Sequence, residues 1–240
     1  MLRTEIGPGL TEQELDAVET RFGFTFAADH RVFLTTGLPR GSAGWPDWRD
    51  GDPEDLAGRL ARPVEGVLFD VEHNRFWHPA WPSRPAETPE ALRAARNELE
   101  SAPRLVPVHG HRYLPGTAGG HGHPVLSVHQ TDVILYGNDL TDYIHHEFAG
   151  RPSGLRAHAT VDFWSYSVEG GPGVDVTAPT PFSPYAVTAQ EAVECIRTLV
   201  ERTDACNDPA AIRRGAREHL AERIGEEAGR LLDGPWPPLG

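Results

Sequence analysis

The sequence contains little that would support a secreted or membrane-bound protein. No apolar run among its 240 residues is long enough to cross a bilayer, and the first residues lack the apolar segment of a signal peptide. Its two cysteines, Cys195 and Cys206, lack the CxxC spacing of thiolate zinc sites and do not indicate a disulfide framework. We therefore expect a folded cytoplasmic protein whose cysteines are reduced and passive.

Positive charge is also scarce. The chain has 22 Lys+Arg against 35 Asp+Glu, a net charge of −13, and every basic residue is an arginine. Such a balance opposes non-specific binding to nucleic acid and to anionic membranes. We therefore expect neither of these partners, and an acidic surface favours a basic protein partner instead.

Motifs of catalysis and phosphate binding are absent from the chain. It contains no H-E-x-x-H, no G-x-S-x-G, no P-loop and no G-x-G-x-x-G. Ser127, His129 and Asp132 have the residue types of a hydrolase triad, but such sets arise by chance in a chain of this size. The sequence therefore contains no motif that indicates an enzyme, and we expect no cofactor.

What is present is typical of a globular protein, with 39% hydrophobic and 24% charged residues. Helix signals come first along the chain. Thr11 and Glu14 form a capping box, and Asp29 lies near the start of a second helix that ends at Gly37. Asp52-Pro53 and Thr88-Pro89 begin two more helices, because proline is tolerated at the first helical position.

Strand signals follow residue 103. Three short segments, RLVPVHGHRY, PVLSVHQ and VILYG, are β-branched or apolar, and Thr131-Asp132 is placed to turn the last two into a hairpin. Asn138 or Asp139 then caps a helix, and the FWSYSV segment that begins at Phe163 is predicted to add another strand.

The order of helices, then adjacent strands, then helices predicts an α+β fold with an antiparallel-rich sheet flanked by helices. We expect one α+β domain over residues 1–168. Helical periodicity returns after Thr188, which predicts a C-terminal helical extension over residues 185–234 that packs on the domain.

Histidines suggest one alternative function. His109 with His111 and His121 with His123 form two His-x-His pairs, and residues i and i+2 of a strand share a face. Since zinc needs three or four ligands, these four support a metal-binding protein or metal-dependent hydrolase as an alternative. His121 and His123 alternate with glycines, however, which is typical of a loop. We therefore favour semi-exposed polar residues at a sheet edge and no bound metal.

Several segments together are similar to a known family. They are, in order, GWPDWRD, VLFDVEHNRFW, WPSRP, RLVPVHGHRYLP and PVLSVHQTDVILYGNDLTDYIHHEF. Over roughly residues 8–150 the chain resembles bacterial members of the SUKH superfamily, which includes the fungal Smi/Knr regulator of cell-wall synthesis. Ala28 stands where a proline is common in that family. The resemblance implies an α+β domain that has no catalytic residues.

The resemblance also implies a function, because bacterial SUKH proteins are largely inferred to be immunity proteins. We therefore expect a non-enzymatic protein-binding domain that binds and neutralises a basic bacterial toxin. A regulatory scaffold linked to cell-envelope synthesis is the other alternative that the family suggests.

Seven residues are candidates for contact with a protein partner. The tryptophans among them either anchor a partner or cover the edge of the core, and each of the others also has a structural explanation. The candidates are Arg112, Tyr113, His129, Asp132, Tyr136, Trp45 and Trp48.

Overall fold

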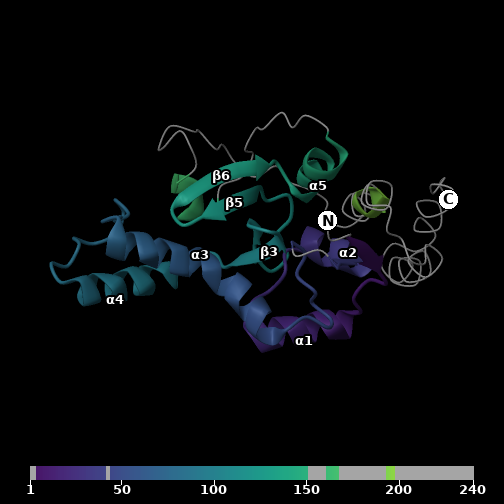
Figure 1. Ribbon diagram of the computed structural model, residues 1–240, viewed down its shortest axis with the longest axis horizontal. Coiled ribbons are helices and arrows are strands. Elements are labelled where there is room, and N and C mark those ends of the chain that lie inside the picture. The colour runs from purple at the N-terminus through teal and green to yellow at the C-terminus, as the bar shows by residue number, and fades with distance from the viewer. Residues whose placement is uncertain (1–3, 42–43, 151–160, 168–192, 198–240) are drawn as a thin grey trace.

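The fold is α+β, with two antiparallel sheets and helices around them. The computed structural model describes residues 4–41, 44–150, 161–167 and 193–197 (Figure 1). The elements are β1 (Glu5–Gly7), α1 (Glu12–Phe22), α2 (Ala28–Thr36), β2 (Leu38–Arg40), α3 (Pro53–His73), α4 (Thr88–Leu99), β3 (Leu105–His109), β4 (Arg112–Pro115), β5 (Val125–His129), β6 (Asp132–Gly137), α5 (Leu140–Ala149) and the 3₁₀ helix η1 (Trp164–Ser167). Every helix within these residues is too short or too polar to cross a membrane.

The larger sheet is a meander in the order β3-β4-β5-β6. The β3–β4 and β5–β6 turns lie at one end of it, because each antiparallel strand reverses the chain. Gly110, in the first turn, has φ +59°, which glycine adopts without strain. The long β4–β5 connection, residues 116–124, lies at the opposite end of the sheet.

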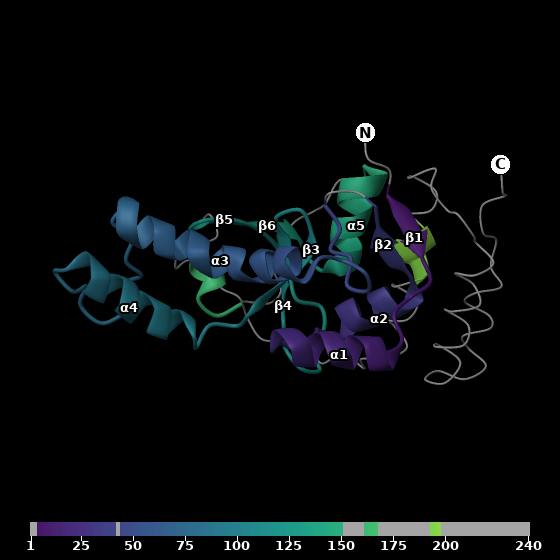
Figure 2. The same ribbon diagram turned by 60° about the horizontal axis from the view of Figure 1, so that its bottom comes forward.

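Both faces of this sheet are covered by helices. Along β4 and β5, Tyr113 and Leu126 belong to a core shared with α4 and the second half of α3, whereas Leu114 and Val125 belong to the core shared with α1, α2, α5 and the first half of α3. Adjacent side chains of a strand point to opposite faces, so this alternation sorts the strands between the two cores. Figures 1 and 2 show α3 and α4 extending side by side beyond the sheet, away from α1, α2 and α5.

Helix α3 carries a proline in its interior, and the sheet compensates for it. Pro63 has no N–H to donate to the carbonyl of Arg59, four residues earlier. The hydroxyl of Tyr113 in β4 donates to that carbonyl instead, at 3.3 Å. Tyr113 is fully buried, so this hydrogen bond gives its side chain a polar partner.

A second contact fixes α3 to the β5–β6 turn. The buried carboxylate of Asp70 accepts hydrogen bonds from the Thr131 backbone N–H at 2.9 Å and the Thr131 hydroxyl at 2.5 Å. One turn earlier, Gly66 lets the turn approach closely, because a Cβ atom there would lie 2.8 Å from the Cα of Gln130. These contacts set the position of the hairpin along the helix.

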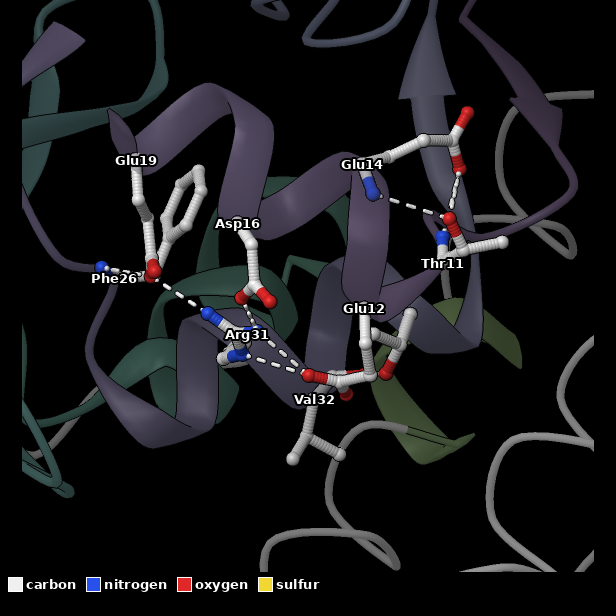
Figure 3. Close-up of polar contacts among 9 residues, drawn as sticks. Thr11, Glu12, Glu14, Asp16, Glu19, Phe26, Arg31 and Val32 are labelled. Atoms are coloured by element: carbon white, nitrogen blue, oxygen red, sulfur yellow. Dashed lines mark hydrogen bonds and ion pairs between the residues drawn. The ribbon is translucent and has the colours of Figure 1, made fainter. Parts of the chain in front are cut away.

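Helices α1 and α2 are joined by one arginine (Figure 3). Arg31 of α2 forms ion pairs with Glu12 at 2.6 Å, Asp16 at 2.6 Å and Glu19 at 2.8 Å, all on α1. The predicted capping box of Thr11 and Glu14 is present at the start of α1. Because the guanidinium is shared among three carboxylates, it sets the pairing of the two helices more firmly than one surface ion pair would.

Several sequence predictions are confirmed. The α+β class is correct, and helices begin after Thr11, Asp52 and Asp139 as their caps predict. The β5–β6 hairpin also forms, with its turn at Gln130-Thr131, one residue earlier than predicted. The short β1–β2 pair was not predicted, because three-residue strands carry almost no periodicity.

One other prediction is wrong, and a second lies mostly outside the described residues. The predicted strand at Phe163 is wrong, because Phe163 has φ +66° and the segment turns into η1. The predicted extension over residues 185–234 lies outside the described residues except for 193–197. Those five residues are helical, and Val193 and Ile196 are buried in the core that includes α1, α2 and α5.

The Tyr113 hydroxyl gives a test of this packing. Tyr113→Phe should lower the free energy of unfolding by about 1–2 kcal/mol, because it removes the hydroxyl that donates to the Arg59 carbonyl in place of the missing Pro63 N–H. In a Pro63→Ala background the restored backbone N–H replaces that donor, and Tyr113→Phe should then cost less. Urea denaturation of the four proteins measures both effects. Tyr136→Phe serves as the control, and equal costs of Tyr113→Phe in both backgrounds would contradict the compensation.

Candidate functional site

Arg112 lies on the sheet face opposite α3 and α4. It precedes Tyr113 in β4, and burial of Tyr113 toward α3 directs Arg112 to the other face. Arg112 pairs with Ser127 of β5, which pairs in turn with Ile134 of β6. The face therefore includes one residue from each of three neighbouring strands.

The guanidinium of Arg112 is held from two sides. Its Cζ atom lies 3.7 Å from the centroid of the Tyr136 ring, which is a close cation–π contact. Its Nη1 donates to Nε2 of the neighbouring His111. The Tyr136 ring is itself fixed by an edge contact with His146 of α5, at 5.6 Å between ring centroids. The arginine is thus ordered before any partner binds.

Arg112 differs in its charge partners from three other half-buried arginines. Arg31, Arg49 and Arg59 each form an ion pair with a carboxylate. Arg112 forms none within the described part of the chain, and its Nε is buried without a hydrogen-bond partner. Half-buried Arg84 also forms no ion pair in the described residues, but its guanidinium donates to the Phe76 and Val71 carbonyls. A buried N–H without an acceptor is costly, so the Nε group of Arg112 is incompletely satisfied in the isolated protein.

A histidine–tyrosine pair lies behind this face. The Tyr143 hydroxyl and Nδ1 of His109 are joined by a hydrogen bond of 3.2 Å. The His109 ring packs against Trp45 at 4.7 Å and Phe148 at 5.3 Å between centroids. Burial lowers the pKa of His109 from its ordinary value near 6.5 to about 4, and burial raises the pKa of Tyr143. Both groups are therefore neutral near pH 7, and the pair supports the face structurally.

His111 is also neutral near pH 7. Burial, followed by the nearby charge of Arg112, lowers the pKa of His111. A neutral imidazole keeps a lone pair on one nitrogen, which is what the Nη1 donor of Arg112 requires.

The two His-x-His pairs do not converge. His109 ends β3 and His111 is in the following turn, so the pair does not lie on one strand as the i, i+2 argument assumed. His121 and His123 lie in the β4–β5 connection, at the other end of the sheet. In the described ranges, no group of three or more His, Cys, Asp or Glu side chains is placed to hold a metal ion. The sequence pattern of residues 105–115 resembles one strand and does not reveal the tight turn between β3 and β4. This turn separates His109 from His111.

His121 and His123 instead belong to a loop that packs on the start of α2. The buried Asp29 carboxylate accepts from the Gly122 backbone N–H at 3.0 Å, and the Ala28 N–H donates to the Gly120 carbonyl at 2.7 Å. Nε2 of His123 lies 3.3 Å from the Thr117 hydroxyl. The loop therefore closes over the helix terminus as a structural element.

The seven predicted contact residues separate into two groups. Trp45, Trp48 and Tyr113 are only 4%, 3% and 0% exposed, so the prediction that they contact a partner is corrected and they are core residues. The Trp45 indole N–H donates to Thr4, and the Tyr113 hydroxyl is used by α3.

The other four candidates lie at the surface of the sheet. Arg112 and Tyr136 are half-buried on one face, and His129 and Asp132 are exposed and face each other beside the β5–β6 turn. His146, which fixes Tyr136, was missed as a contributor. No sequence signal pointed to it, because its contact joins a helix to a strand ten residues earlier.

No protein-family model, curated protein sequence or solved structure matches this chain. The candidate site therefore stands on its own geometry.

The lowered pKa of His109 predicts how stability depends on pH. Because the folded state favours the neutral ring, the stability that this histidine contributes is present above pH 6.5 and is lost as pH falls toward 4. Its contribution to the slope is at most about 1.4 kcal/mol per pH unit. His109→Phe should flatten the dependence of the unfolding free energy on pH across this range. Chemical denaturation at a series of pH values measures how the unfolding free energy changes with pH. An unchanged slope in His109→Phe would refute the claim that the lowered pKa of His109 causes this dependence.

Metal content is a separate test of the histidine hypothesis. Protein purified without a polyhistidine tag should contain only substoichiometric transition metal by mass spectrometry, because the two pairs lie at opposite ends of the sheet. A stoichiometric metal that disappears in the His109→Ala/His111→Ala variant would contradict this placement.

Proposed function

We propose that the chain is a non-enzymatic, SUKH-like protein-binding domain that acts as an immunity protein, binding and neutralising a basic bacterial toxin. The observation that carries the proposal is the ordered Arg112–Tyr136 pair at the edge of the α5 packing, with an arginine that forms no ion pair within the described residues. The sequence resemblance and the net charge support the same function.

Arginine and tyrosine are the residue types most suited to such a face. Both are enriched among the few residues that carry most of the binding energy at protein interfaces. The contacts of Arg112 with His111 and Tyr136 restrict its side chain in advance, which reduces the conformational entropy lost on binding. Exposed His129 and Asp132, at the adjacent end of the sheet, supply a polar rim.

The charge of the whole chain supports a basic partner. A net charge of −13 attracts a positively charged domain over a distance comparable with the Debye length, and this raises the association rate. Many toxin domains that act on nucleic acid are basic, because their substrate is a polyanion. A binder of this charge blocks such a domain by covering its functional surface, and no chemical step is required of it.

The test is binding to, and protection from, a basic toxin domain encoded beside this gene. We expect a one-to-one complex by calorimetry, survival of cells that express both proteins, and an association rate that falls as salt is added. Tyr136→Ala should weaken binding by at least about tenfold, as at other interface anchors. Phe69→Ala is the matched control, because Phe69 is an exposed aromatic residue, at 44%, on α3.

Two results would overturn the proposal. One is the absence of both binding and protection with each neighbouring toxin domain. The other is a complex that Phe69→Ala weakens and Tyr136→Ala leaves unchanged, which would place the binding surface on α3.

A further inference from the structure

The hydrogen bond between His111 and Arg112 depends on the protonation state of an exposed side chain. His111 is solvent-exposed in the β3–β4 turn, and its Nε2 accepts from Nη1 of Arg112. Only a neutral imidazole has a lone pair for this purpose, because both ring nitrogens of a protonated histidine are donors. Protonation of His111 therefore removes the hydrogen bond and places two positive charges beside each other.

We propose that His111 is a pH-sensitive switch on the partner-binding face. Its neutral ring fixes the guanidinium of Arg112 beside Tyr136, and protonation of the ring releases that guanidinium. That the face binds a partner rests on the proposed function, whereas the movement of Arg112 is a property of the isolated chain. The switch weakens binding in acid relative to neutral pH.

The direction of the switch follows from the coupling between the hydrogen bond and the proton. Burial, followed by the charge of Arg112, lowers the pKa of His111 below its ordinary value of 6.5. Because such coupling is reciprocal, the proton disfavours the Arg112 contact as much as that contact disfavours the proton. The contact is therefore fully present above pH 6.5 and is lost as pH falls through the lowered pKa of His111.

Other charged and titratable groups surround the two residues. The groups that act on the charge of His111 are Arg112 of β4, His129 of β5, Arg62 of α3 and Glu147 of α5. The first three disfavour the proton, and Glu147 favours it. His109, at the end of β3, is neutral near pH 7, since burial lowers its pKa to about 4. Beside Arg112, β6 contributes Tyr136, and the ring of Tyr136 contacts His146 of α5.

Release of Arg112 weakens binding through conformational entropy. The guanidinium loses one of its two supports, so its side chain regains rotamers that a partner must immobilise again. Immobilising one long side chain corresponds to a loss of affinity of roughly two- to tenfold. The loss is moderate because stacking on Tyr136 does not require His111.

The test is a pH titration of the free, isotopically labelled full chain by nuclear magnetic resonance, in the range where circular dichroism shows the chain folded. The ¹³Cζ signal of Arg112, assigned by its loss in Arg112→Gln, should move with the same midpoint as the ring signals of His111. An Arg112 signal that stays still while His111 titrates would overturn the switch. So would a His111 ring that stays neutral until the chain unfolds.

Three variants separate the switch from a general effect of pH. His111→Gln keeps an acceptor that does not titrate, so the Arg112 signal should no longer move. His129→Gln is the matched control, because His129 has no hydrogen bond to Arg112 in the described residues, and the movement should remain. Arg112→Gln should raise the pKa of His111 toward 6.5. Equal movement of Arg112 in wild type and His111→Gln, or an unchanged pKa of His111 in Arg112→Gln, would contradict the proposal.

Calorimetry with the toxin domain at a series of pH values distinguishes the switch from the proposed function. Wild type and His111→Gln should bind equally near pH 7, and wild type should bind roughly two- to tenfold more weakly once His111 is protonated. If the complex forms and both proteins show the same pH dependence, the switch fails while the immunity function stands. If Arg112 moves with His111 and no toxin domain binds, the function fails while the coupling within the chain stands.

Discussion

The hydrogen bond from the Tyr113 hydroxyl to the Arg59 carbonyl is the contact on which the arrangement of the rest depends. It compensates for Pro63, a residue that would otherwise leave a gap in the hydrogen bonding of α3. It also fixes β4 against the helix, and the Asp70–Thr131 contact then fixes the β5–β6 turn on the same helix. Because side chains alternate along a strand, burying Tyr113 toward α3 directs Arg112 to the other face. The position of the candidate residue Arg112 is therefore set by the burial of its neighbour Tyr113.

The supports of Arg112 come from different parts of the chain. His111 lies in the turn before it, Tyr136 comes from β6, and His146 comes from α5. The neutral His109–Tyr143 pair fills the space behind them without adding charge. An acidic protein thus carries an ordered arginine, Arg112, that forms no ion pair with a carboxylate of the described residues. In the proposed function, overall charge favours the approach of a basic partner, and Arg112 contributes to the contact surface.

The sequence predicted the parts of the fold that depend on local chemistry. Caps such as Thr11, Asp52 and Asp139 begin helices because their oxygens accept the first free N–H groups, and this effect is visible in a few residues. The turn at Gly110-His111 was missed because a strand and a tight hairpin of two short strands share the same apolar pattern. That error joined His109 and His111 on one strand and made a metal cluster look possible.

The site was only partly predictable for a related reason. Arg112 and Tyr136 were selected as candidates, but so were Trp45, Trp48 and Tyr113, which are buried. An aromatic residue near a turn has the same sequence signature whether it covers the core or anchors a partner. Only tertiary contacts separate these cases, such as the Trp45–His109–Phe148 packing and the use of the Tyr113 hydroxyl by α3.

The central claim is that a protein partner binds the Arg112–Tyr136 face. Site-specific photo-crosslinking tests it most directly, with benzoylphenylalanine in place of Ile134, which shares this face, or of Phe69, which lies on α3. The account predicts a covalent adduct with the basic toxin domain from position 134 and none from position 69. An adduct from position 69 alone would contradict it.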